Sequence, residues 1–286
     1  MRESSIRGLV VTADDFGAAL AVNAAVEQAH VEGILTAASL MVSGAAAGDA
    51  VERARRLPSL GVGLHIVLAD GDPVLPPERI PALVGADGRF HESMLRTALA
   101  IAASGGARKQ LAAEIEAQFA AFAATGLPLD HVNAHKHFHL HPMIASAILR
   151  IGPKYGMKAM RVPYERGGTR PLRWWARQLR GRLRKAGLTV NDRFIGLSWT
   201  GAMDASRMRA AVNDPVDGLI EIYCHPATSD DWAGHAPGYR YRDELAALID
   251  PAIVRALADS GVRRGSFAQF AAARAVSGET SRRLAA

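Results

Sequence analysis

Short apolar segments alternate with amphipathic segments along the first 70 residues. Residues 6–13, 36–42 and 61–68 are short, mostly apolar and rich in β-branched side chains, which predicts buried strands. The segments between them, 18–31 and 45–57, have the composition of helices and end at Gly33 and Pro58. This order predicts a parallel sheet whose strands are joined by helical crossovers.

The rest of the chain continues the alternation less regularly. Residues 70–90 are rich in proline and glycine, which predicts a long loop and a candidate lid. After residue 276 the sequence is polar and predicts a frayed tail. We expect further strands over 129–134, 158–162, 194–198 and 218–224 and near Val262, and helices over 92–103, 107–124, 142–155, 170–186, 243–260 and 267–275.

Six to eight strand–helix units in one chain of 286 residues favour a single-domain α/β fold. We expect a distorted or incomplete (β/α) TIM-like barrel over residues 1–276, followed by the polar tail 277–286. An open doubly wound sheet is the alternative. In a barrel, the carboxyl ends of all strands meet at one face, where active sites form.

The bulk composition is that of a globular protein, with 49% apolar and 22% charged residues. Cys224 is the only cysteine, which excludes an internal disulfide and favours a reducing compartment. The N-terminal residues have no secretory pattern, and no apolar run approaches the roughly 20 residues of a membrane span. We therefore expect a cytoplasmic protein.

The net charge of +6 is concentrated in one interval. Residues 166–185 hold eight arginines and lysines and no acid, and most lie in the predicted helix 170–186. Leu172, Trp175, Leu179 and Leu183 fall on one face of that helix, which is typical of a helix lying on a membrane surface. The alternative is a core-packed helix with a solvated basic face. No nucleic-acid partner is expected, because aromatic spacing suited to base stacking is absent.

Acids and histidines stand at or near the ends of four predicted strands, so a barrel would bring them to one rim. Asp14 and Asp15 are adjacent carboxylates, which are costly to bury unless a cation lies near them. They predict either a metal site or a cap for the following helix.

The segment 131–141 holds half of the ten histidines. If it were extended, His135, His137, His139 and His141, which stand at every second residue, would share one face. Six extended steps span about 20 Å, so only one or two of these side chains could ligate one ion. The others would line the site, or the whole run would be a pocket without metal.

His65 and His225 each lie in an apolar strand. His65 is either a hydrogen-bonded core residue or a ligand, and His225, which precedes a proline, is either an acid/base group or structural. Cys224 beside it is interpreted as a small buried residue rather than a thiol nucleophile. Phosphate-loop and serine-hydrolase motifs are absent from the sequence.

Taken together, four segments of the chain resemble the YdjC-like carbohydrate deacetylases, which include the chitooligosaccharide deacetylases. The segments are Ala13-Asp14-Asp15-Phe16-Gly17, Gly63-Leu64-His65, the run from His131 to His139, and Cys224-His225-Pro226. They occur in the family's order along nearly the whole chain. The histidine run is most similar to the hopanoid-biosynthesis branch of the family.

This resemblance implies a distorted barrel and one divalent metal ion, Mg²⁺ or Zn²⁺, held by Asp15, His65 and His135. It also implies Asp14 as the general base and His225 as the general acid in hydrolysis of an N-acetyl amino sugar. The hopanoid branch implies a glycolipid, an N-acetylglucosaminyl hopanoid, which would suit a membrane-contacting helix.

Two departures accompany the resemblance. Thr12 stands where close relatives often have Asn, and Asn133 stands where many members have Asp. Two alternative functions stay open: another metal-dependent hydrolysis, such as phosphoester cleavage with two metals, and a non-catalytic metal- or carbohydrate-binding module.

Overall fold

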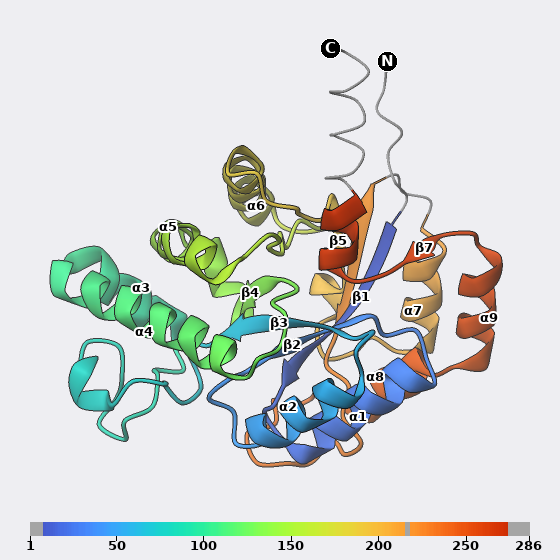
Figure 1. Ribbon diagram of the computed structural model, residues 1–286, viewed down its shortest axis with the longest axis horizontal. Helices are drawn as coiled ribbons and strands as arrows, with labels where there is room; N and C mark the ends of the chain where they lie inside the picture. The colour runs from blue at the N-terminus through green and yellow to red at the C-terminus, as the bar shows by residue number, and fades with distance from the viewer. Residues whose placement is uncertain (1–7, 215–217, 274–286) are drawn as a thin grey trace, which may run out of the picture.

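The computed structural model describes residues 8–214 and 218–273 (Figure 1). Its centre is a parallel sheet of the order β4-β3-β2-β1-β6-β5, in which β7 pairs with the start of β1. The strands are β1 (Gly8–Phe16), β2 (Ala37–Leu40), β3 (Gly61–Ile66), β4 (Val132–Ala134), β5 (Arg193–Ile195), β6 (Leu219–Cys224) and β7 (Arg263–Arg264).

Helices surround this sheet, as the crossovers of a parallel sheet require (Figure 1). A further helical segment, 267–273, ends the described chain. The named helices are α1 (Leu20–Val31), α2 (Ala47–Arg56), α3 (Met94–Ala103), α4 (Gly105–Ala124), α5 (Pro142–Ile151), α6 (Arg170–Lys185), α7 (Ala205–Val212), α8 (Tyr241–Leu248) and α9 (Pro251–Asp259).

The sheet curls so that its two edges are linked through the segment 158–164. Met160 forms a parallel bridge to Val132 of β4, and Ala159 forms one to Thr189 ahead of β5. The amide of Phe194 in β5 also donates to the carbonyl of Tyr164. The predicted strand 158–162 is thus reduced to bridges. The fold is a curled parallel half-barrel in one domain, which is consistent with a distorted barrel rather than an open doubly wound sheet.

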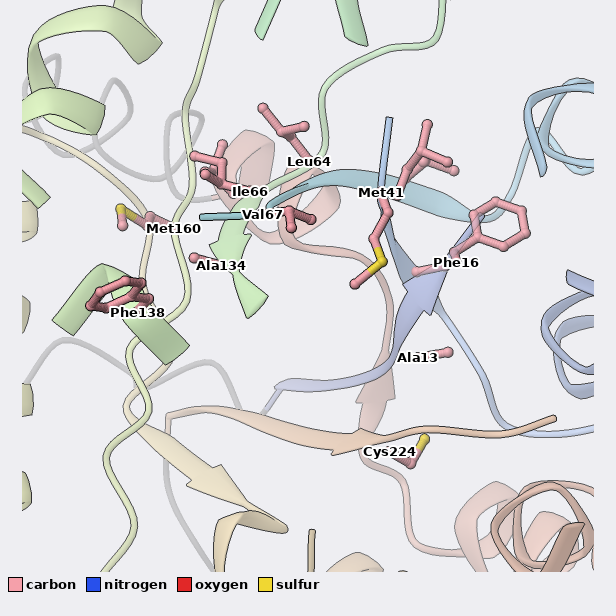
Figure 2. Packing of buried hydrophobic residues seen from close by; sticks show 14 of the residues in the cluster. Ala13, Phe16, Met41, Leu64, Ile66, Val67, Ala134, Phe138, Met160 and Cys224 are labelled. Carbon is pink, nitrogen blue, oxygen red and sulfur yellow. The ribbon is translucent and has the colours of Figure 1, made fainter. Parts of the chain in front are cut away.

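Successive side chains along each strand point to opposite faces of the sheet, so the sheet separates two apolar cores. Outward side chains such as Val11, Leu64 and Ile66 belong to the large core beneath the helices, part of which Figure 2 shows. Inward side chains at the amino-terminal end form a smaller apolar cluster, the floor of the sheet's interior. The floor consists of Val10, Ala37, Ala159, Leu219, Phe267 and Phe270.

Directly above the floor, the inward side chains are polar yet buried. Thr12 in β1, Ser39 in β2 and Glu221 in β6 are each 0% exposed. Each lies two residues after a floor residue of the same strand, so this polar layer separates the floor from the carboxyl end of the sheet.

Some predicted boundaries were wrong. The predicted helix 243–260 is two helices, because Pro251 begins α9 and cannot continue α8. Helix α7 was not expected, although Asp204 caps it by accepting from the amide of Arg207. Only part of the predicted helix 267–275 lies in the described chain, and the predicted tail 277–286 lies outside it.

The loop 70–90 is anchored to α4. Glu114 of α4 accepts hydrogen bonds from the amides of Val74 and Leu75, both 2.9 Å. Ile80 and Leu83 of the loop are fully buried. The first half of the candidate lid is therefore packed against the body of the protein.

Helix α6 packs on the body through Ala176, Leu179 and Leu183. Trp175, which was expected to share one face with Leu172, Leu179 and Leu183, is 42% exposed, and Trp174 is 53% exposed. The buried stripe follows the spacing of residues 176, 179 and 183, so Trp175 falls outside it. Every helix in the described part of the chain is too short or too polar to cross a membrane.

Candidate metal centre

Asp15, His65 and His135 converge at the carboxyl end of the sheet. One possible ligand atom from each lies within 4.8 Å of the other two. Asp15 Oδ1 is 3.3 Å from His65 Nε2 and 3.1 Å from His135 Nδ1. The side chains of His135 and Asp15 are 18% and 12% exposed, whereas that of His65 is 2% exposed. Solvent therefore reaches the cluster from the side of His135 and Asp15.

A β-bulge near the end of β1 places both adjacent carboxylates in the interior. In a regular strand, Asp14 and Asp15 would point to opposite faces. The register between β1 and β2 shifts between Ala13 and Phe16, and Asp15 adopts a left-handed φ of 63°. The helix-capping alternative is wrong, because α1 begins after Ala19 without a side-chain cap.

The histidine run is not extended, so its histidines do not share one face as they would in a strand. It forms a 3₁₀ segment, His135–Leu140, with a kink at Lys136 and His137, whose φ angles are 52° and 55°. The kink leaves His135 beside Asp15 and turns the later side chains away from the cluster. Lys136 forms a 2.6 Å ion pair with Asp70, which ties the kink to the start of the long loop.

The donor set of the cluster fits a divalent cation. His65 Nδ1 is 2.6 Å from the side-chain oxygen of Asn133, to which it donates. A neutral His65 therefore directs the lone pair of Nε2 at the carboxylate of Asp15, an arrangement that is repulsive without a positive charge between them. One carboxylate and two imidazoles are ligands that suit a transition ion such as zinc.

Asn133 joins the cluster to Asp14. Its amide group donates to Asp14 Oδ1 at 3.1 Å and to Ser39 Oγ at 2.9 Å, while its oxygen accepts from His65. An aspartate at this position would offer no proton to Asp14 and would add a second negative charge beside it. The departure at Asn133 therefore has a physical consequence in this chain.

Arg161 holds Asp14 from the other side. The guanidinium donates to both carboxylate oxygens of Asp14, at 2.9 Å for Oδ1, and to Glu221 at 2.8 Å. It also lies over the rings of Phe194 and Tyr223. Burial alone would raise the pKa of Asp14, but the charge and hydrogen bonds of Arg161, together with the charges of His65 and His225, hold that pKa well below its usual range. Asp14 is thus a fixed, ionised carboxylate.

His225 follows β6 and is 8% exposed. Its backbone amide donates to Glu244 of α8, while its side-chain Nδ1 is buried without a hydrogen-bond partner among the described residues. Its ring packs edge-on against Tyr223 and Tyr239. The positive form of His225 would lower the pKa values of both Asp14 and Asp15, which places it in the same electrostatic environment.

Three other histidines of the run, His137, His139 and His141, lie outside the candidate metal cluster. His139 Nδ1 accepts from the amide of Ala134 at 3.1 Å, and burial lowers the pKa of His139 to about 3. His137 packs against Phe194 and Tyr223, and burial lowers its pKa as well. His141 precedes α5. His137 and His139 line the interior, and all three are neutral imidazoles because burial lowers their pKa values.

Cys224 is confirmed as a small buried residue. It is 1% exposed, and burial raises the pKa of its thiol well above the usual value. The thiol therefore stays protonated and is a poor nucleophile.

Sequence reasoning missed Arg161, Glu221 and Glu244. Glu221 is the single charge in the otherwise apolar predicted strand 218–224, and Arg161 stands between the apolar residues Met160 and Val162 of the predicted strand 158–162, with the opposite sign. That pattern could have indicated a buried ion pair. Glu244 lies in a helix and gave no signal.

A curled parallel sheet with a carboxylate and two imidazoles at its carboxyl end defines the class: an α/β barrel-like protein with a candidate single-metal site. The chain belongs to the YdjC-like family, whose model, described as YdjC-like protein, matches residues 8–259.

Named relatives cover almost the whole chain. It is 29% identical over 265 residues to a carbohydrate deacetylase of Brevibacillus brevis, covering 92% of this chain and 99% of the relative. It is 32% identical to a human carbohydrate deacetylase, covering 89% and 88%. It is 30% identical to a chitooligosaccharide deacetylase of Salmonella schwarzengrund, covering 91% and 98%.

One solved structure shares the fold over nearly its whole length. It is a protein from Enterococcus faecalis V583 named for cellobiose-phosphate cleavage, with a TM-score of 0.76 and 22% identity. The match covers 93% of this chain and 99% of that one. At this identity the likeness concerns the fold alone.

Proposed function

We propose that this protein is a metal-dependent carbohydrate deacetylase that hydrolyses the N-acetyl group of an amino sugar. The observation that carries the proposal is the convergence of Asp15, His65 and His135 at the carboxyl end of the sheet. Membership of the YdjC-like family and relatives named as carbohydrate deacetylases support the reaction. Hydrolysis of an amide consumes one water and yields acetate and a free amine.

Asp15, His65 and His135 would hold one divalent ion, Zn²⁺ or Mg²⁺. An ion bound there would polarise the acetyl carbonyl and lower the pKa of water. Three protein ligands leave coordination positions free, as catalysis requires. The nitrogen-rich donor set favours zinc over magnesium, which prefers oxygen ligands.

Asp14 is the proposed general base. Its carboxylate is fixed by Arg161 and Asn133 next to His65, so it is oriented and ionised before substrate binds. Arg161 makes Asp14 a weak base in isolation. It would therefore accept a proton from the attacking water only where that water is already acidified.

His225 is the proposed general acid. It directly follows β6, and its imidazole Nδ1 has no hydrogen-bond partner in the described chain. As an imidazolium it would donate its proton to the nitrogen of the amine as the C–N bond breaks. The neutral imidazole then regains a proton from solvent.

The test is acetate release from a soluble N-acetylglucosamine oligomer by the wild type and by Asp14→Asn, each with added Zn²⁺ or Mg²⁺. We expect retained metal and an activity lower by about 10²–10⁴-fold in the variant. Equal activities would overturn the role of Asp14. A metal content near two per chain would favour the phosphoester alternative, and no release with full metal occupancy would favour a binding module.

A glycolipid is a second candidate substrate, and helix α6 favours it. Trp174 and Trp175 are exposed and pack against each other at 4.8 Å between ring centroids. Of the eight basic residues in 166–185, only Arg184 forms a salt bridge with an acid in the described chain. Exposed tryptophans surrounded by arginines and lysines that lack acidic partners are suited to contact with an anionic membrane surface.

Because the histidine run also resembles the hopanoid-biosynthesis branch of the family, we propose an N-acetylglucosaminyl hopanoid as the form of the sugar substrate. The test offers that glycolipid and the soluble oligomer side by side. Release from the glycolipid alone would support it. Acetate release from the soluble oligomer alone would support the deacetylase activity and contradict the glycolipid substrate.

A further inference from the structure

A continuous chain of buried side-chain hydrogen bonds connects Asp130 with the candidate metal ligand His65. Asp130 Oδ2 is 2.8 Å from His131 Nδ1, and His131 Nε2 is 3.0 Å from Ser39 Oγ. Ser39 Oγ is 2.9 Å from Asn133 Nδ2, and Asn133 Oδ1 is 2.6 Å from His65 Nδ1. The chain thus spans three neighbouring strands, β2, β3 and β4, inside the sheet.

All five side chains are shielded from water. Their exposed fractions are 3% for Asp130, 1% for His65 and 0% for His131, Ser39 and Asn133. Water therefore cannot substitute for a lost partner, and a broken link would leave a buried polar group unsatisfied.

The direction of every hydrogen bond follows from the carboxylate at one end. Burial alone would raise the pKa of Asp130, but the charge of His131 and hydrogen bonds from His131, Ser266 and the amide of Ala268 together lower it, so Asp130 is ionised. It therefore accepts from His131 Nδ1. Because the Ser39 oxygen accepts from Asn133, the Ser39 hydroxyl proton is directed at His131 Nε2, which accepts it.

The same logic continues to the metal ligand. The Ser39 hydroxyl donates a hydrogen bond to His131, and its oxygen accepts one from the amide nitrogen of Asn133. This fixes the amide with its oxygen toward His65 and its second N–H toward Asp14. His65 must then carry its proton on Nδ1, which leaves Nε2 free as a ligand.

The first two side chains of this hydrogen-bonded series, Asp130 and His131, are held in place by further contacts. The His131 ring lies against Gly63, where an added Cβ would come within 2.5 Å of the ring. Asp130 also accepts from the amides of Phe267 and Ala268, at 3.2 and 2.8 Å. Only glycine fits at position 63 when the His131 ring occupies the position seen here, so the close contact holds the ring in one orientation.

We propose that Ser39 and His131 are positioning residues that set the tautomer and orientation of His65 through Asn133, and so determine metal affinity without touching the metal. The inference rests on the proposed metal site. Metal-ligating histidines are commonly oriented by a single carboxylate. Here the group that orients His65 is the amide of Asn133, and this amide must itself be oriented by Ser39.

The experiment measures the Zn²⁺ dissociation constant by competition with a chromophoric chelator, for the wild type, Ser39→Ala and Ser39→Thr. Loss of an outer hydrogen-bond partner typically weakens metal binding about 10–100-fold. We expect that loss in Ser39→Ala, and binding close to wild type in Ser39→Thr, which keeps the hydroxyl. The visible absorption of bound Co²⁺ should change in Ser39→Ala, reporting an altered ligand geometry.

Ser59→Ala is the matched control. It also removes a serine–histidine hydrogen bond, that of His30 Nε2 at 2.8 Å, far from the site at the opposite end of the strands. We expect its zinc affinity to equal that of the wild type. Unfolding of the metal-free proteins checks that each variant is folded. If Ser39→Ala does not fold, His131→Phe, which keeps a planar ring but no hydrogen bonds, replaces it.

The outcomes separate the two proposals. A wild type that binds neither Zn²⁺ nor Co²⁺ at Asp15, His65 and His135 would contradict the proposed metal site. A wild type that binds zinc tightly, with Ser39→Ala and His131→Phe unchanged in affinity and in the Co²⁺ spectrum, would overturn the positioning role alone.

Discussion

Arg161 and Asp14 form a doubly hydrogen-bonded ion pair in which the side chains are 0% and 3% exposed. Glu221, also 0% exposed, takes a further hydrogen bond from the same guanidinium. A buried arginine between two carboxylates is costly to desolvate but fixes all three groups. The pair therefore orients Asp14 rather than adding much to net stability.

Replacing Arg161 by Met should destabilise the protein strongly, because two buried carboxylates lose their partner. We expect the free energy of unfolding to fall by about 3–5 kcal/mol, measured by urea denaturation at pH 7. Arg53→Met is the control, since Arg53 pairs with Glu27 and Asp49 nearer the surface and should cost no more than about 1 kcal/mol. Similar losses in the two variants would contradict this account.

Removal of metal should lower stability only when the candidate ligands are intact. At a free Zn²⁺ concentration of 100 times the dissociation constant, binding adds about 2.7 kcal/mol to the free energy of unfolding. Zinc should therefore raise the melting temperature of the wild type, and a chelator should reverse the effect.

His135→Ala should lose that response to zinc, while His141→Ala should keep it. His141 belongs to the same histidine run but lies outside the cluster. An unchanged zinc effect in His135→Ala would place the metal elsewhere.

Acid should destabilise the metal-free protein through His139. Its pKa is about 3 when folded and about 6.5 when unfolded, so between these values the unfolded state binds the extra proton. The contribution is complete above about pH 6.5 and falls by up to about 1.4 kcal/mol per pH unit as the pH drops toward 3.

His139→Asn isolates this contribution. Asparagine keeps an acceptor for the amide of Ala134 but does not titrate. Urea unfolding at pH 7, 6 and 5 should therefore show a shallower pH dependence in the variant. An identical slope would assign the acid sensitivity to other groups.

Helix α6 should bind vesicles that contain anionic lipid, and the binding should weaken with salt. We expect co-sedimentation with anionic but not with zwitterionic vesicles, reduced in the double variant Trp174→Ala/Trp175→Ala. Leu95→Ala in α3 is the control, an exposed apolar residue outside the basic helix. Binding of RNA at equal salt with no binding of vesicles would reassign the surface.

The sequence predicted what depends on local pattern and motif. Strands β1, β2, β3 and β6 and the ligand set Asp15, His65 and His135 follow from apolar runs and from residue types shared with the family. The metal-ligand roles and the assignments of Asp14 and His225 stay predictions, since their geometry alone does not test them.

What escaped prediction depends on pairings between distant residues. Arg161 meets Asp14 across 147 positions of sequence, and Asp130 meets Ala268 across 138. The left-handed backbone at Asp15 and Lys136 likewise arises because tertiary packing fixes it, and neither residue type reveals it.

The floor of the interior has a consequence for synthesis on the ribosome. Phe267 and Phe270 close the floor, and the amides of Phe267 and Ala268 hold Asp130. Residues near the C-terminus thus complete the layer beneath a site whose ligands all lie in the first half of the chain. A nascent chain that has emerged only through β6 still lacks this floor, so the layer beneath the site is completed only after residues 267–270 have emerged.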